Sequence, residues 1–180
     1  MQHRAAFLDL NGTLVMPIKV EAPELYTPIP GALEAVAVLN DAGFLCPVIT
    51  VQSRIAKGLY SEATFRCWFT SFSQRADELG ASFAGLYICP HRFHSGCLCG
   101  KPNPDLYRQA ARDHVIDCSH SYVVGDSVDD MEAAQRMRMK GCLVLTGQGA
   151  ASAERLRTPP AYIGADLRAV AEWIVPFPQW

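Results

Sequence analysis

Residues 5–13 read AAFLDLNGT, a run of apolar side chains that ends in a polar turn. A short apolar run bounded by turn residues predicts a buried β-strand over residues 5–10. Asp9 then lies near the end of the strand, and Gly12 lets another group approach the backbone closely. We therefore expect a chemically active turn here, with Asp9 as its candidate nucleophile.

Strand and helix patterns alternate along most of the chain. Strands are predicted at residues 44–50, 83–88, 121–124 and 142–145, and helices at 31–41, 61–79, 104–114 and 128–139. Four prolines within residues 17–30 predict a loop or a small flap. This alternation is typical of an α/β fold, in which helices cover both faces of a parallel sheet and ligands bind beyond the carboxyl ends of the strands.

Bulk properties narrow the classes of function. The chain has 180 residues, of which 49% are apolar, and a formal net charge of −2. That is enough for the core of a single domain over residues 1–180. The chain lacks the excess of positive charge that attracts nucleic acid or anionic membranes, so neither is an expected partner. The expected ligand is a small phosphorylated metabolite. The charge at Asp9 and the lack of a long apolar stretch predict a cytoplasmic protein, and the oligomeric state stays open.

A second acidic cluster, GDSVDD at residues 125–130, follows another predicted strand. Its carboxylates can seat a hard divalent cation such as Mg²⁺, which would neutralise charge between Asp9 and an incoming phosphate. Either acidic motif alone could equally be a strand end or a helix cap. Thr50 also follows a predicted strand, so the expected fold gathers Asp9, Thr50 and Asp126 at one rim of the sheet.

Four segments, in this order, resemble the motifs of the haloacid dehalogenase (HAD) superfamily of aspartate-nucleophile phosphotransfer enzymes. They are FLDLNGTL (7–14), VITVQSRIAKG (48–58), GKPNPDLYRQAA (100–111) and YVVGDSVDDMEAA (122–134). The resemblance implies a HAD-like, Rossmann-type fold with three α/β/α layers and a mainly parallel sheet. The short connections around the first two motifs predict that there is no large cap domain.

The resemblance also implies roles for the site residues. Asp9 would attack phosphorus to form an aspartyl-phosphate that water then hydrolyses, while Thr50 and Lys101 hold the transferring phosphoryl group. Asp126, together with Asp9 and the backbone carbonyl of Asn11, would bind Mg²⁺. The expected phosphate- and substrate-binding set is Thr50, Gln52, Ser53, Arg54 and Lys101.

A cysteine-rich loop precedes the motif lysine. Within residues 89–99 it supplies three thiolates and one imidazole, enough for a closed tetrahedral Zn²⁺ site. These ligands are Cys89, His91, Cys97 and Cys99, and the nearby His94 could substitute for one of them. A closed site has no position for water, so zinc would stiffen the loop and take no part in chemistry. The same arrangement occurs in the subclass IIIA HAD phosphatases for heptose 1,7-bisphosphate and histidinol phosphate, which the chain resembles most.

Three positions depart from that group. Asn11 stands where an aspartate normally protonates the leaving alcohol and later activates water, and an amide can do neither at neutral pH. Val51 replaces an asparagine, and Gly100 replaces an arginine that could pair with a phosphate or a sugar oxygen. Arg54, where the family usually has glycine, or Lys57 could supply the missing charge.

Two functions follow from this pattern. The first is a Mg²⁺-dependent phosphatase, also carrying Zn²⁺, for a sugar phosphate or bisphosphate of carbohydrate metabolism. The second is a catalytically impaired phosphate-binding or regulatory protein, because of Asn11. Dehalogenation or C–P cleavage is a further alternative. Asn11 itself could reflect natural divergence, a phosphatase relic or a deliberate substitution, and the departures at positions 51 and 100 favour natural divergence.

Overall fold

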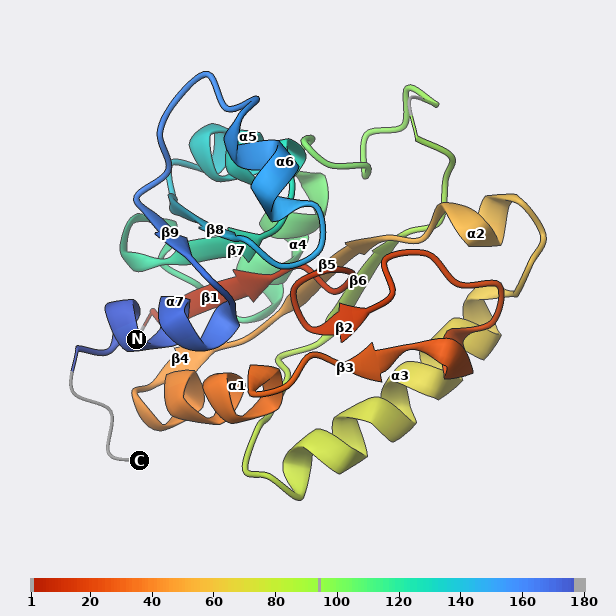
Figure 1. Cartoon of the computed structure of the whole chain (residues 1–180), viewed down its shortest axis with the longest axis horizontal. Coiled ribbons are helices and arrows are strands. Elements are labelled where there is room, and N and C mark those ends of the chain that lie inside the picture. The colour runs from red at the N-terminus through yellow and green to blue at the C-terminus, as the bar shows by residue number, and fades with distance from the viewer. Residues whose placement is uncertain (1, 94, 177–180) are drawn as a thin grey trace.

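The computed structural model describes residues 2–93 and 95–176. Its centre is a parallel sheet with the strand order β6-β5-β1-β7-β8-β9, to which the short β4 adds by pairing with β1 (Figure 1). The strands are β1 (Arg4–Leu8), β4 (Phe44–Leu45), β5 (Val48–Val51), β6 (Leu86–Cys89), β7 (Tyr122–Gly125), β8 (Lys140–Val144) and β9 (Tyr162–Gly164). All of these pairings are parallel, which confirms the predicted α/β class.

Helices cover both faces of the sheet. They are α1 (Ala32–Asp41), α2 (Ser53–Ala56), α3 (Glu62–Asp77), α4 (Asp105–Asp113), α5 (Val128–Met137), α6 (Gly149–Ala153) and α7 (Leu167–Ile174), with 3₁₀ turns η1 (Pro23–Leu25) and η2 (Cys118–His120). Side chains of α1, α3 and α7 share one core cluster with the sheet, and side chains of α4 and α5 share the other. The molecule therefore has the predicted three layers.

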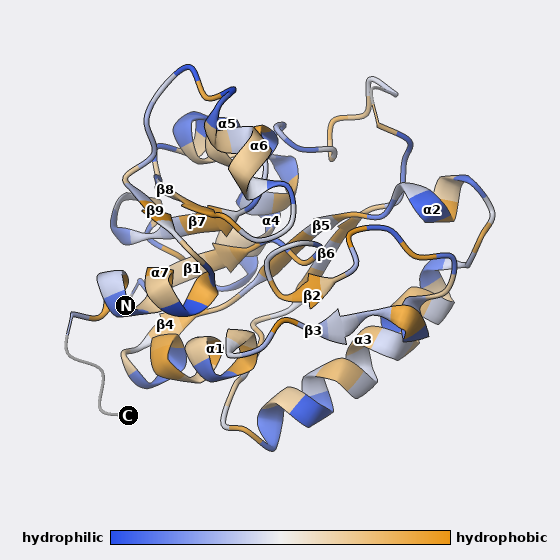
Figure 2. Cartoon of the chain, in the orientation of Figure 1, coloured by the Kyte–Doolittle hydropathy of each residue, from blue (hydrophilic) through white to orange (hydrophobic). Residues whose placement is uncertain are grey.

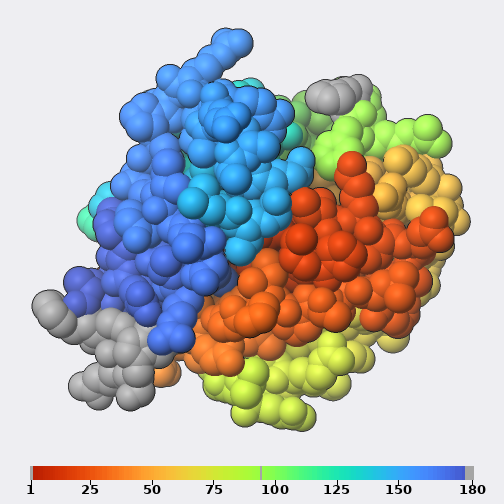
Figure 3. Space-filling view, in the orientation of Figure 1, coloured from red at the N-terminus to blue at the C-terminus, as the bar shows by residue number. Residues whose placement is uncertain are grey.

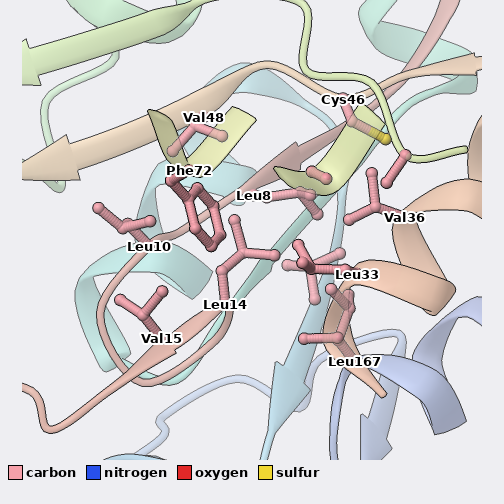
Figure 4. Close-up of a cluster of buried hydrophobic side chains, with 14 of the residues drawn as sticks. Leu8, Leu10, Leu14, Val15, Leu33, Val36, Cys46, Val48, Phe72 and Leu167 are labelled. Carbon is pink, nitrogen blue, oxygen red and sulfur yellow. The ribbon is translucent and has the colours of Figure 1, made fainter. Parts of the chain in front are cut away.

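The alternation of side chains along β1 explains the two cores. Ala6 and Leu8 point into the cluster that contains Phe72, whereas Ala5 and Phe7 point into the opposite one. Figure 4 shows Leu8 and Phe72 packed together, and Figure 2 shows apolar strands at the centre of the fold. Because both faces of β1 are buried beyond the exposed Arg4, residues 5–8 are all apolar.

Two sequence predictions needed correction. The strand predicted at residues 44–50 is divided into β4 and β5, with Pro47, which has no N–H to donate, between them. The predicted elements also ended at residue 145, but the chain continues through α6, β9 and α7. The first two are too short to show a period, whereas α7 had a readable start, since Asp166 caps it by accepting from Ala169 N at 2.9 Å.

A small flap lies beside the carboxyl ends of the strands. It contains η1 and an antiparallel pair, β2 (Val15–Met16) with β3 (Thr27–Pro28). On the face shown in Figure 3, this red-orange flap meets the green loop before residue 100 and the blue segment after β8. Within the described residues the flap takes the place of a large cap domain, and none of the helices has the length and apolar character needed to cross a membrane.

Candidate active site

Asp9, at the carboxyl end of β1, forms a buried ion pair with Lys101. Lys101 Nζ lies 2.6 Å from Asp9 Oδ1 and 2.7 Å from Asp130 Oδ1, so one lysine bridges two carboxylates. Asp130 also accepts from the Ser127 hydroxyl at 2.5 Å, in the capping box that begins α5. The start of α5 and the loop that carries Lys101 are thereby tied to the end of the central strand.

Asp126, at the end of β7, is held in a space that only glycines leave open. A Cβ at Gly12 or at Gly147 would overlap its carboxylate. Gln148 N donates to Asp126 Oδ2 at 2.7 Å, and Thr146 Oγ1 donates to the Gly12 carbonyl at 2.6 Å. The turn after β8 therefore fixes both the carboxylate and the turn that follows Asp9.

Three carboxylates and a single lysine make this region electrostatically strained. Burial, together with Asp130 and Asp126, raises the pKa of Asp9 to about 8 against the opposing charge of Lys101. Burial also raises the pKa of Asp126 to about 6. For Lys101, burial alone would lower the pKa, but Asp130 and Asp9 raise it well above its usual value.

Carboxylate oxygens of Asp9, Asp126 and Asp130 lie within 4.8 Å of one another. Hard oxygen donors gathered this closely fit Mg²⁺, and a divalent cation would relieve the excess negative charge. Asp130 uses Oδ1 for Lys101 and Oδ2 for Ser127, whereas Asp9 and Asp126 each have only one oxygen hydrogen-bonded among the described residues. Asp9 and Asp126 are therefore the carboxylates best placed to act as ligands.

A neutral hydrogen-bond network lies beside the carboxylates. Asn11 Oδ1 accepts from Gln52 Nε2 at 2.7 Å and from Thr50 Oγ1 at 3.3 Å. Gln52 Oε1 in turn accepts from the Tyr60 hydroxyl at 2.9 Å. Asn11 Nδ2 is buried and has no hydrogen-bond partner among the described residues. The network fixes the amide of Asn11 with its oxygen toward Gln52, and the Asn11 side chain also opposes the rise in the pKa of Tyr26 that burial causes.

These side chains line a pocket of about 510 Å³. Most of the predicted site residues are on its walls: Asp9, Asn11, Gln52, Ser53, Arg54, Lys101 and Asp126. Thr50 lies behind them, fully buried, with its hydroxyl bonded to Gln52 and Asn11. Lys19 and Tyr26 of the flap, and Arg155 after α6, were not predicted but also line the pocket.

Asp130 and Gln148 were likewise missed as partners of the site. Asp130 could have been found from its capping-box spacing after Ser127. Gln148 acts through its backbone, so its residue type carried no signal. The contacts that Tyr26 and Tyr60 make depend on how the flap and α2 fold back, which short polar loops do not predict.

The four predicted zinc ligands come together in the loop after β6. Cys89 Sγ lies 3.6 Å from Cys97 Sγ and 3.8 Å from His91 Nδ1, and His91 Nδ1 lies 3.2 Å from Cys99 Sγ. Two thiolates on one tetrahedral zinc are about 3.8 Å apart, so this spacing and this soft donor set fit Zn²⁺. All seven cysteines are free thiols. The predicted substitute ligand, His94, lies outside the described residues.

Comparisons with known proteins agree with this geometry. Residues 98–170 match the family described as HAD-hydrolase-like. The chain is 32% identical to the D-glycero-beta-D-manno-heptose-1,7-bisphosphate 7-phosphatase of Pseudomonas aeruginosa, over 95% of this chain and 97% of that protein. It is 34% identical to the corresponding enzyme of Thermosynechococcus vestitus, over 97% and 96%.

Solved structures point the same way. The D,D-heptose 1,7-bisphosphate phosphatase of B. bronchiseptica, complexed with magnesium and phosphate, superposes with a TM-score of 0.89 at 31% identity, covering 96% of this chain and 98% of that one. The D,D-heptose 1,7-bisphosphate phosphatase of Burkholderia thailandensis gives a TM-score of 0.75 at 28% identity, over 97% and 99% of the two chains.

Proposed function

The chain belongs to the haloacid dehalogenase superfamily. On this premise we propose that it is a sugar-bisphosphate phosphatase. It would hydrolyse a heptose bisphosphate-like substrate through an aspartyl-phosphate, with Mg²⁺ as its cofactor. The buried contact of Asp9 with Lys101, next to Asp126, carries this proposal. The magnesium in the B. bronchiseptica structure supports the choice of metal.

In the proposed reaction, a carboxylate oxygen of Asp9 attacks phosphorus as the bond to the sugar oxygen breaks. Water then attacks the aspartyl-phosphate and releases inorganic phosphate and free Asp9. Lys101 balances the negative charge of the phosphoryl group as that group approaches Asp9. Mg²⁺ held by Asp9, Asp126 and the backbone carbonyl of Asn11 would lower the repulsion between the phosphate and the carboxylates.

Asn11 sets the expected rate. A carboxylic acid at this position would give a proton to the leaving sugar oxygen and take one from the attacking water, whereas an amide does neither. Loss of a positioned acid/base typically costs about 10²- to 10⁴-fold in rate. We therefore propose a slow phosphatase in which the leaving oxygen takes its proton from water.

A second candidate function is a phosphate-binding or regulatory protein with little turnover. The network around Asn11 favours it, because Gln52 and Thr50 hold the amide in place without a carboxyl group. A pocket with intact anion contacts but no proton donor suits binding better than catalysis.

We further propose a structural Zn²⁺ on Cys89, His91, Cys97 and Cys99, since three thiolates and an imidazole would close the coordination sphere. Zinc would then hold the loop two residues before Lys101. We take residues 1–180 as one HAD-like domain. Zinc thiolates and seven free cysteines suit a reducing compartment, so we propose that the protein acts in the cytoplasm.

Release of inorganic phosphate from a panel of sugar mono- and bisphosphates with Mg²⁺ tests the proposal. The wild type and Asn11→Asp are assayed together, with Asp9→Asn as the blank. Turnover by the wild type that disappears in Asp9→Asn would support the phosphatase. Turnover by Asn11→Asp alone would favour the second candidate function, a phosphate-binding protein. If neither protein released phosphate, hydrolysis of the phosphomonoesters in that panel would be excluded.

A further inference from the structure

Three cations stand at the pocket entrance with few partners of their own. Arg54, half-buried at the start of α2, and Lys19 of the flap both line the pocket and have no hydrogen bond or carboxylate partner among residues 2–93 and 95–176. Arg155 lines it from the segment after α6, and its Nε donates to the Ala151 carbonyl at 3.2 Å. These three cations add positive charge to a lining that also contains Asp129.

Several arginines on the longer helices have acids beside them, unlike Arg54 on the short α2. Four of them lie within 4.0 Å of an acid three or four residues away: Arg66 with Glu62, Arg108 with Asp105, Arg136 with Glu132, and Arg168 with Glu172. Inside the pocket, Lys101 is neutralised by Asp9 and Asp130. An unpaired, half-buried arginine at the mouth of a pocket is a site for an external anion.

Arg54 stands next to the neutral side of the pocket. Burial raises the pKa of both Tyr26 and Tyr60, and the positive charge of Arg54 opposes that rise in each. Its guanidinium therefore lies near both phenols, and Tyr60 bonds to the Gln52 that holds Asn11. Arg54 therefore lies on the same side of the pocket as Asn11. The leaving sugar would extend toward this side as its bond to phosphorus breaks.

Gly100, at the position where an arginine is expected in the related phosphatases, provides no charge. A Cβ at Gly100 would lie 3.1 Å from Cys97 Sγ and 3.6 Å from Cys89 Sγ. A side chain at Gly100 would therefore require the Cys97 sulfur to shift by a few tenths of an ångström. The pocket, at about 510 Å³, has room for a sugar with two phosphates, which would reach from Asp9 to the entrance.

We infer that Arg54, assisted by Lys19 and Arg155, binds the second phosphate of the substrate, the one that is not hydrolysed. This inference rests on the proposed function and deepens it, because it assigns the choice of a bisphosphate over a monophosphate to these cations. The guanidinium offers paired donors to phosphate oxygens, and the other two cations of the pocket lining add longer-range attraction.

A comparison of matched substrates tests the inference. D-glycero-D-manno-heptose 1,7-bisphosphate and the corresponding 7-phosphate share the ester that reacts and differ only in the second phosphate. We would measure the ratio of kcat/KM for the two with Mg²⁺ in the wild type, Arg54→Gln, Arg54→Lys and Lys57→Gln. Lys57 is the matched control, because it is exposed on the same segment and is absent from the described pocket lining.

The wild type should prefer the bisphosphate, and Arg54→Gln should lower the ratio about 10- to 100-fold through KM for the bisphosphate. Arg54→Lys should keep part of the preference, and Lys57→Gln should stay within about two-fold of the wild type. An unchanged ratio in Arg54→Gln would overturn the inference. So would an equal loss for both substrates, since Arg54 would then act on the reacting phosphoryl group. If Arg54→Gln does not fold, Arg155→Gln takes its place, with a smaller expected fall.

The inference can be separated from the proposed function by binding. If none of the proteins turns over either sugar, dissociation constants from titration calorimetry replace the kinetic ratio. Tighter binding of the bisphosphate that is lost in Arg54→Gln would support the second-phosphate site even in an inactive protein. Equal affinity for the two sugars, or no binding of either, would overturn it.

Discussion

The two ends of the active-site pocket are built from different kinds of interaction. The phosphoryl end, which we define as Asp9, Lys101, Asp126 and Asp130, consists of buried charges that neutralise one another. The leaving-group end, which we define as Asn11, Gln52, Tyr26, Tyr60 and Arg54, consists of neutral hydrogen bonds and one unpaired cation.

The difference shows which end can change during divergence. Removing one charge from the phosphoryl end leaves another charge buried without a partner, which is costly. At the leaving-group end, an amide accepts the same hydrogen bonds from Gln52 and Thr50 that a carboxylate would accept. A substitution such as Asn11 therefore alters the chemistry with little cost to the fold.

The largest effect should come from the phosphoryl end. Asp9→Asn removes the attacking carboxylate and should lower kcat at least about 10⁴-fold. Asp41→Asn makes the same chemical change on the surface at the end of α1 and should leave kcat within about two-fold. Phosphate release measures both. If Asp9→Asn kept its activity, Asp9 would not be the nucleophile.

The next effect tests whether the leaving-group end lacks only a proton donor. Asn11→Asp should raise kcat about 10²- to 10⁴-fold, because the new carboxyl group would occupy a position already held by Gln52 and Thr50. Asn11→Ala, which removes those contacts without adding an acid, should not raise it. A fall in kcat for Asn11→Asp would mean that the added negative charge beside Asp9 outweighs the gain in acid catalysis.

A smaller effect is expected from the zinc loop that leads into the phosphoryl end. Cys99→Ser should lose the bound zinc, and the melting temperature should fall by roughly 5–10 °C if the metal contributes about 2.7 kcal/mol. Cys67→Ser, on the exposed side of α3, is the control and should keep both the zinc and the melting temperature of the wild type. Elemental analysis measures the zinc content of the two variants, and thermal unfolding measures their melting temperatures. Undiminished zinc in Cys99→Ser would argue against this ligand set.

The smallest effect, on stability, should come from the hydrogen bond between Tyr60 and Gln52, the residue that donates to Asn11. Tyr60→Phe removes the hydroxyl that donates to Gln52 Oε1, leaves a buried acceptor unpaired, and should lower the free energy of unfolding by about 1–2 kcal/mol. Tyr162→Phe is the control, since the Tyr162 hydroxyl has no hydrogen bond within the described part of the chain. Urea denaturation compares them. Equal stabilities would mean that Gln52 finds another donor when the hydroxyl is absent.

The fold and the family were predictable because they depend on local patterns. Apolar runs alternating with helical stretches indicated a parallel sheet, and the four ordered segments that carry Asp9, Thr50, Lys101 and Asp126 indicated the superfamily. Two of the elements that escaped prediction, α6 and β9, are only five and three residues long and carry too little periodicity to be read.

The sequence by itself determined which reactive groups the chain has: a carboxylate for attack, carboxylates for a metal, thiolates for zinc, and an amide in place of an acid. Only the tertiary structure decided their partners. It brought Asp130 to Lys101 across 29 residues and Gln52 to Asn11 across 41, and it put Arg54, not Lys57, on the pocket wall. The physical reason is that residue type fixes what a side chain can donate, accept or ionise, whereas its neighbours depend on how strands distant in the sequence pair in the sheet.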